Sequence, residues 1–255
     1  MTQEQDVVLY SIEGSTARIR LNRPDKRNAL NDELIAAIKE RLIAANSDDN
    51  LRVVVISGEG KDFCSGADLS ALQKISKASV SENAEDASSL AELFILIRQL
   101  EIPVVAAVKG RALAGGCGLA SACDIVLASS SARFGYPEVK IGFVPAMVLA
   151  ILRRNVSEKK AFELLTRGEE ISAEDGLRFG LVNQVYKEEV FYEEVEAYLK
   201  RFDEVSKSAV SLTKKLLYQV DNVSFIEALQ TGVDVNVIAR LTEDCQKGIA
   251  RFLKN

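Results

Sequence analysis

Residues 109–120 read Lys109-Gly110-Arg111-Ala112-Leu113-Ala114-Gly115-Gly116-Cys117-Gly118-Leu119-Ala120. They follow the apolar run 104–108 and precede Ser121-Ala122-Cys123-Asp124. This order predicts a strand, a glycine-bearing turn and the start of a helix. Glycine lets the backbone approach a ligand closely, and the first amides of a helix have no intrahelical partner. The stretch is therefore a candidate site for an anion or a developing oxyanion.

Short apolar runs alternate with helical patterns on both sides of this stretch, and the chain ends in a helical region. The runs predict a hairpin over 7–12 and 16–21 and strands buried on both faces at 53–56 and 125–128. The C-terminal patterns predict amphipathic helices over 190–217 and 224–253. Together they predict an α/β fold with an all-helical C-terminal part.

Between the predicted strand at 16–21 and residue 104, only part of the chain is expected to be helical. Asn31 or Asp32 is expected to cap a first helix, and residues 90–100 have the apolar spacing of another. Residues 70–89 are rich in Ser, Ala, Glu, Asp and Lys and have few large apolar side chains. That composition predicts a mobile segment.

Composition narrows the functional class. The chain has 255 residues, 47% of them hydrophobic, which suffices for one large domain or one domain with an appendage. A net charge of −5 disfavours a nucleic-acid-binding surface. No leader pattern and no apolar run near the length of a membrane span is visible, so we expect a cytoplasmic protein without membrane attachment. The four cysteines lack metal-type spacing and are expected to be reduced, buried thiols, with no metal site.

Histidine is absent from the sequence. This excludes Ser-His-Asp and Cys-His catalysis, histidine-ligated zinc and imidazole acid–base chemistry. Any proton transfer must therefore use Asp, Glu, Lys, Tyr or Cys.

Three loops, at 66–68, 115–116 and 137–138, each follow a predicted buried strand. Such loops can converge on one crevice in layered α/β folds. Two of them could supply backbone N–H donors and the third a carboxylate. That combination suits enolate chemistry beside a carbonyl, because the amides stabilise the oxyanion while the carboxylate moves a proton.

Nearly the whole chain resembles the crotonase (enoyl-CoA hydratase/isomerase) superfamily. The motifs that carry the resemblance are Asn22-Arg23-Pro24 with Asn28-Ala29-Leu30, residues 63–69, residues 110–120, Cys123-Asp124, residues 134–138 and residues 248–252. The resemblance implies ββα turns stacked as a spiral, acyl-CoA thioester substrates, and no cofactor, since CoA is part of the substrate. It also implies a core domain over 1–195 and a C-terminal helical region over 196–255 that builds a homotrimer or a dimer of trimers.

The resemblance also assigns roles to individual residues. The backbone amides of Ala67 and Gly115 would hold the thioester oxygen, and Glu138 would be the catalytic carboxylate, with its pKa raised by its surroundings. The residues expected to border CoA or substrate are Lys26, Arg27, Ala29, Ser65, Asp68 and Leu69. Asp68 is also expected to cap a helix, and Tyr136 to be a packed ring with its hydroxyl bonded nearby.

One departure from the family pattern limits the assignment. The hydratases of the family usually carry a second glutamate three residues after the oxyanion glycine, and here that position is Gly118. The leading interpretation is hydration of 2-enoyl-CoA to 3-hydroxyacyl-CoA in fatty-acid or branched-chain acyl catabolism, as in the bacterial enoyl-CoA and methylglutaconyl-CoA hydratases that the chain resembles. The alternatives are a Δ3,Δ2-enoyl-CoA isomerase with Glu138 as its sole base, and a non-catalytic acyl-CoA-binding scaffold.

Overall fold

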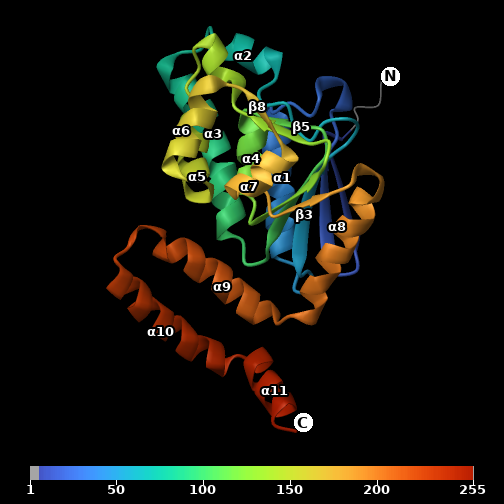
Figure 1. Ribbon diagram of the computed structural model, residues 1–255, viewed down its shortest axis with the longest axis vertical. Coiled ribbons are helices and arrows are strands. Elements are labelled where there is room, and N and C mark those ends of the chain that lie inside the picture. The colour runs from blue at the N-terminus through green and yellow to red at the C-terminus, as the bar shows by residue number, and fades with distance from the viewer. Residues whose placement is uncertain (1–5, 255) are drawn as a thin grey trace.

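A six-stranded sheet forms the centre of the computed structural model, which describes residues 6–254 (Figure 1). The strands follow the order β1-β2-β3-β4-β6-β9, and all neighbours are parallel except the hairpin β1–β2. Their bounds are β1 Val8–Glu13, β2 Thr16–Leu21, β3 Val53–Gly58, β4 Val104–Val108, β6 Ile125–Ser129 and β9 Gln184–Tyr186. The predicted α/β class and the predicted hairpin are confirmed.

The sheet is covered by helices on both faces, which explains its continuously apolar strands. In β3, Val54 and Ile56 belong to the large core beside α1 (Asp32–Asn46) and α3 (Val80–Gln99). Val53 and Val55 face the other way and pack in a second cluster with α8 (Phe191–Lys200). Successive side chains of a strand point to opposite faces, so a strand covered on both sides has no polar face.

A smaller sheet accompanies the first. Its strands, in their order across the sheet, are β5 (Arg111–Leu113), β7 (Arg133–Gly135) and β8 (Glu170–Ser172), with β5 parallel to β7 and β7 antiparallel to β8. Thus β4 in the large sheet is followed by β5 in the small one, and β6 by β7. Helix α4 (Gly115–Ala122) follows β5 directly. These repeated steps from sheet to sheet build the spiral that the family resemblance implies.

The predicted mobile segment over 70–89 is helical instead. It comprises most of α2 (Leu69–Ile75) and the first half of α3, which begins with a capping box between Ser79 and Glu82. The small and charged residues that suggested disorder include Ala, Glu and Lys, which are strong helix formers, and here they cover the outer side of a helix. At α1 the cap is Asn31, whose side chain accepts from Leu34 N at 3.0 Å.

The remaining helices complete the core and then leave it. Two helices, α5 (Ala146–Asn155) and α6 (Glu158–Arg167), lie between β7 and β8 in the chain. Helix α7 (Ala173–Phe179) follows β8. The pattern over 190–217 divides into α8 and α9 (Lys207–Gln219), and that over 224–253 into α10 (Phe225–Leu241) and α11 (Glu243–Phe252). Ser206 and Thr242 cap α9 and α11, so each break has a local cause. None of the described helices is long and apolar enough to cross a membrane.

Helix α9 attaches to the core through a buried ion pair. Lys214 Nζ donates to Asp124 Oδ2 at 2.7 Å and to the carbonyls of Ile97 and Ile102 at 2.8 and 2.9 Å. Tyr218 donates its hydroxyl to Asp124 Oδ1 at 2.7 Å. Asp124 therefore has the structural role that its place at a strand start suggests.

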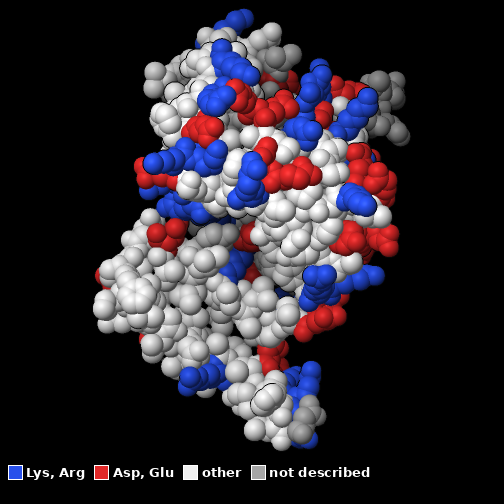
Figure 2. All heavy atoms as spheres, in the orientation of Figure 1, with Lys and Arg blue, Asp and Glu red and all other residues white. Residues whose placement is uncertain are grey.

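Helix α10 extends away from the core (Figure 1). It leaves a row of apolar side chains exposed. In Figure 2 this lower part of the molecule is mostly white, in contrast to the charged surface of the core. The exposed apolar residues of α10 are Phe225, Ile226, Leu229, Val233, Val237, Ile238 and Leu241. An apolar surface of this kind is typical of a protein–protein contact.

Candidate active site

In the loop before α2, the backbone N–H of Ala67 points away from Leu30, the residue with which Ala67 forms a β-bridge. Leu30 N donates to Gly66 O at 2.7 Å, and Asp68 N donates to Leu30 O at 2.9 Å. In this parallel bridge the two residues that flank Ala67 make the bonds, so its own N–H points to the opposite side. Ala67 lines a cavity, as does Leu30.

Gly115 supplies a second outward amide as the first residue of α4, where an N–H has no intrahelical partner. The preceding residue, Ala114, has φ +50° and ψ −127°, a conformation that strains an L-residue. Ala114 N donates to Gly135 O at 2.8 Å. A Cβ on Gly66 would lie 2.7 Å from Ala114 Cβ, so the two loops are in direct contact.

Glu138 enters the same cavity from the third loop. Pro137 starts a 3-10 turn over Pro137–Ile141, and Glu138 is half-buried in it. Its Oε2 is buried, and no hydrogen-bond partner for it exists among the described residues. Burial raises the pKa of Glu138, as the sequence-based interpretation expects, because an ionised carboxylate is poorly solvated there.

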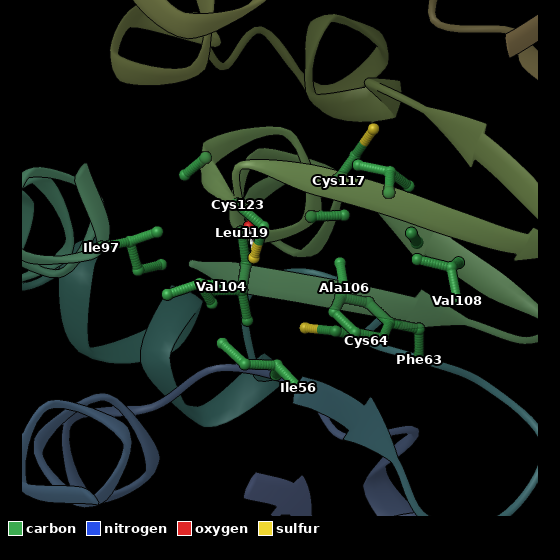
Figure 3. Close-up of a cluster of buried hydrophobic side chains, with 14 of the residues drawn as sticks. Ile56, Phe63, Cys64, Ile97, Val104, Ala106, Val108, Cys117, Leu119 and Cys123 are labelled. Carbon is green, nitrogen blue, oxygen red and sulfur yellow. Dashed lines mark hydrogen bonds between the residues drawn. The ribbon is translucent and has the colours of Figure 1, made fainter. Parts of the chain in front are cut away.

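Buried polar and thiol groups lie behind these loops. Tyr136 is 1% exposed, and its hydroxyl lies 3.3 Å from Ser121 Oγ on α4, so it is the predicted packed ring. Cys64 and Cys117 are buried among aliphatic side chains (Figure 3). Burial raises the pKa of the Cys64 thiol to about 12 and that of Cys117 to about 11. Both thiols are therefore protonated and unreactive near neutral pH.

One cavity of about 500 Å³ joins the three loops, which converge as predicted. Ala67, Gly115 and Glu138 all line it, and most of its wall is apolar. The apolar residues of the wall are Leu30, Ile35, Ala71, Leu72, Ile75, Ala87, Leu90, Ala114, Pro137, Ile141, Phe143, Val144, Pro145, Ala146, Met147 and Val148. Two outward amides and one carboxylate at an apolar cavity can stabilise an enolate and move a proton beside it.

Gly118 is not among the described residues that line this cavity. A Cβ at that position would lie 2.4 Å from Cγ1 of Val148 and 3.0 Å from Cζ of Phe94. Both neighbours are 4% exposed and belong to the core. Apolar side chains therefore fill the room that a side chain at position 118 would need.

The residues expected to border CoA occupy different environments. Lys26 and Arg27 are exposed at a turn that precedes the cavity residue Leu30. Ser65 lines the cavity, whereas Ala29 is buried.

Asp68 and Leu69 lie at the start of α2. Asp68 caps this helix by accepting from Ser70 N at 3.0 Å, and Arg23 Nη2 lies 2.7 Å from its Oδ2. These bonds lower the pKa of Asp68 and commit its carboxylate to structure. Arg23 is the partner that sequence reasoning missed. The side chain of Leu69 lies outside what the structure describes.

Sequence reasoning also missed polar residues on α3. Asn83 and Asp86 line the cavity together with Ala87 and Leu90. The spacing of three, four and seven residues places all four on one face of a helix. This spacing was the available signal, and the composition of the segment obscured it.

Three comparisons with known proteins agree on the relationship. A family model described as enoyl-CoA hydratase/isomerase matches residues 11–255. A crotonyl-CoA hydratase from Syntrophomonas wolfei is 34% identical, with 97% of this chain and 95% of that protein covered. A 2,3-dehydroadipyl-CoA hydratase from Escherichia coli is 32% identical, with 92% and 91% covered. The crystal structure of an enoyl-CoA hydratase from Mycobacterium smegmatis matches with a TM-score of 0.94 at 29% identity, covering 98% of this chain and 97% of that one.

Proposed function

The chain belongs to the enoyl-CoA hydratase/isomerase family, a family of acyl-CoA enzymes, and on that premise we propose that it hydrates 2-enoyl-CoA to 3-hydroxyacyl-CoA. One observation supports this most directly. Glu138 has a buried oxygen without a described partner, and it lines the same cavity as Ala67 and Gly115. The hydratase names of the relatives agree with it.

The proposed reaction uses these three residues. The N–H groups of Ala67 and Gly115 donate to the thioester oxygen and draw electron density from C3. The carboxylate of Glu138 takes a proton from water as the water oxygen bonds to C3, and the C2–C3 electron pair forms the enolate. The enolate then collapses, and C2 takes the proton from Glu138. One water thus supplies both the hydroxyl and the hydrogen, and Glu138 ends as it began.

The contacts at Gly118 favour a second candidate, the Δ3,Δ2-enoyl-CoA isomerase. Val148 and Phe94 occupy the space that a second carboxylate would need. An isomerase needs only one base, because Glu138 can remove a proton from C2 of a 3-enoyl-CoA and return it to C4. In both reactions the amides of Ala67 and Gly115 stabilise the same kind of enolate.

Two substrates and one variant separate these candidates. The protein is incubated with a 2-enoyl-CoA and, separately, with a 3-enoyl-CoA, and the absorbance of the conjugated enoyl thioester is followed. Loss of absorbance from the first substrate means hydration, and gain from the second means isomerisation. Glu138→Gln should abolish whichever occurs, whereas Glu189→Gln, at an exposed glutamate, should not. Wild type and Glu138→Gln that bind acyl-CoA but are equally inert would contradict both reactions and favour the scaffold.

Assembly and cellular role extend the proposal. The exposed apolar row of α10 supports a homotrimer or a dimer of trimers built through residues 196–255. Light scattering of the intact chain and of Val233→Glu would test this, because a charge in that row should dissociate the assembly.

Fatty-acid or branched-chain acyl catabolism in the cytoplasm is the proposed setting, without a cofactor. Turnover of a panel of acyl-CoA substrates tests the proposed pathway, and cell fractionation tests the proposed location. Activity in the presence of a chelator tests whether a metal cofactor is needed.

A further inference from the structure

The cavity wall has acidic side chains but no lysine or arginine among its described lining residues. Besides Glu138, the acidic residues are Asp32 and Asp86. Asp86 lies on the same face of α3 as Leu90, one helical turn nearer the N-terminus.

Leu90 fixes the position of Asp86 relative to the oxyanion residue. A Cβ on Gly115 would lie 3.7 Å from Leu90 Cδ2, so Leu90 stands beside the start of α4. Asp86 is four residues from Leu90, which is about 6 Å along the helix axis. If the cavity holds an acyl thioester, as the proposed function requires, Asp86 lines the wall about one helical turn from the residue that stands beside Gly115.

The nearest lysine of this region is already paired. Lys74 Nζ lies 2.6 Å from Asp32 Oδ2, and Lys74 is not among the described lining residues. Burial and the charge of Asp32 raise the pKa of Asp86, and the nearby charge of Lys74 opposes this rise in part. The surroundings of Asp86 therefore disfavour its negative charge, and a further negative charge beside it would be opposed more strongly.

We propose that Asp86 is a specificity-determining residue that selects acyl chains with an uncharged end over acyl chains that end in a carboxylate. An acyl chain with a terminal methyl group meets the apolar wall around Ala87 and Leu90. A terminal carboxylate would lose water and face the like charge of Asp86 with no lining cation to offset it.

A binding measurement tests the selection without requiring turnover. Hexanoyl-CoA and adipoyl-CoA have acyl chains of equal length and differ at the end, a methyl group in one and a carboxylate in the other. Calorimetric titration of the full chain should give a Kd for adipoyl-CoA about tenfold or more above that for hexanoyl-CoA. Asp86→Asn should reduce this ratio by about tenfold. Glu85→Gln is the matched control, because Glu85 is exposed on the same helix and should leave the ratio unchanged.

The outcomes distinguish this proposal from the proposed function. Equal affinity of the wild-type chain for the two ligands would overturn the selection, and this measurement needs no variant. A ratio that Asp86→Asn leaves unchanged would overturn it as well, as would failure of both ligands to bind. The expected ratios, combined with no turnover of hex-2-enoyl-CoA or hex-3-enoyl-CoA, would support the selection while refuting the enzymatic proposal.

Discussion

Substituting Gly118 by alanine tests whether Val148 closes this position to any side chain. The added methyl group would lie 2.4 Å from Val148 Cγ1, closer than real side chains approach, and 3.0 Å from Phe94 Cζ. Overpacking a core in this way typically costs about 1–3 kcal/mol. Replacing glycine by alanine inside a helix returns about 0.5–1 kcal/mol. Gly118→Ala should therefore lower the free energy of unfolding by about 0–2.5 kcal/mol.

The sign of this effect should reverse when Val148 is shortened. In a Val148→Ala background the closest atom, Val148 Cγ1, is gone. Only the longer contact of 3.0 Å with Phe94 Cζ remains. Gly118→Ala should then raise the free energy of unfolding by roughly 0.5–1 kcal/mol, the ordinary helix gain. The double-mutant cycle should consequently give a coupling energy of about 1–3 kcal/mol between positions 118 and 148.

Equilibrium unfolding in urea at one protein concentration measures these differences. Gly248→Ala in α11 is the matched control, since a Cβ there meets nothing within 4 Å and should stabilise both backgrounds alike. The reasoning is refuted if Gly118→Ala stabilises the wild-type chain as Gly248→Ala does, or if the effects of Gly118→Ala and Val148→Ala simply add.

Four further outcomes are expected at the site and at the attachment of α9. Glu138→Gln should lower kcat by about a hundredfold or more, measured with the substrate that wild type turns over. Because the ionised form of Glu138 is the base and burial raises its pKa above 4.5, kcat/KM should fall as the pH is lowered through that raised pKa; a profile flat down to pH ~4 contradicts this. Arg27→Ala should raise KM with little change in kcat if this exposed cation meets a CoA phosphate, and an unchanged KM argues against that contact. Lys214→Met should cost about 3–5 kcal/mol of unfolding free energy in urea because it leaves Asp124 buried without its cation, whereas Lys215→Met at an exposed position should cost little.

The strands and the three loops were predictable because their signals are local. Apolar runs such as 53–56 indicate strands covered on both faces, and a loop must follow each of them. The helix cap at Asp68 was likewise predictable from residue type and position. The roles of Ala67, Gly115 and Glu138 came from resemblance and stay predictions, whereas the convergence of their loops on one cavity is a feature of the structure.

What escaped prediction depends on tertiary contacts. The helices over 69–75 and 80–99 cover the cavity with small and polar residues, so their composition resembled that of a mobile segment. The pairing of Arg23 with Asp68 joins residues far apart in the sequence. The closure of position 118 by Phe94 and Val148 joins three separate helices, and no local pattern could indicate it.

That closure also constrains the order of evolutionary change. A lineage that acquires a carboxylate at Gly118 while Val148 is in place passes through an intermediate with a 2.4 Å collision in its core. The reverse order, with Val148 shortened first, passes through an intermediate that has only a small cavity, and position 118 then becomes open to substitution. While Val148 is in place, a side chain at position 118 therefore costs stability. Relatives that carry a side chain at position 118 should accordingly carry a smaller or displaced residue at position 148.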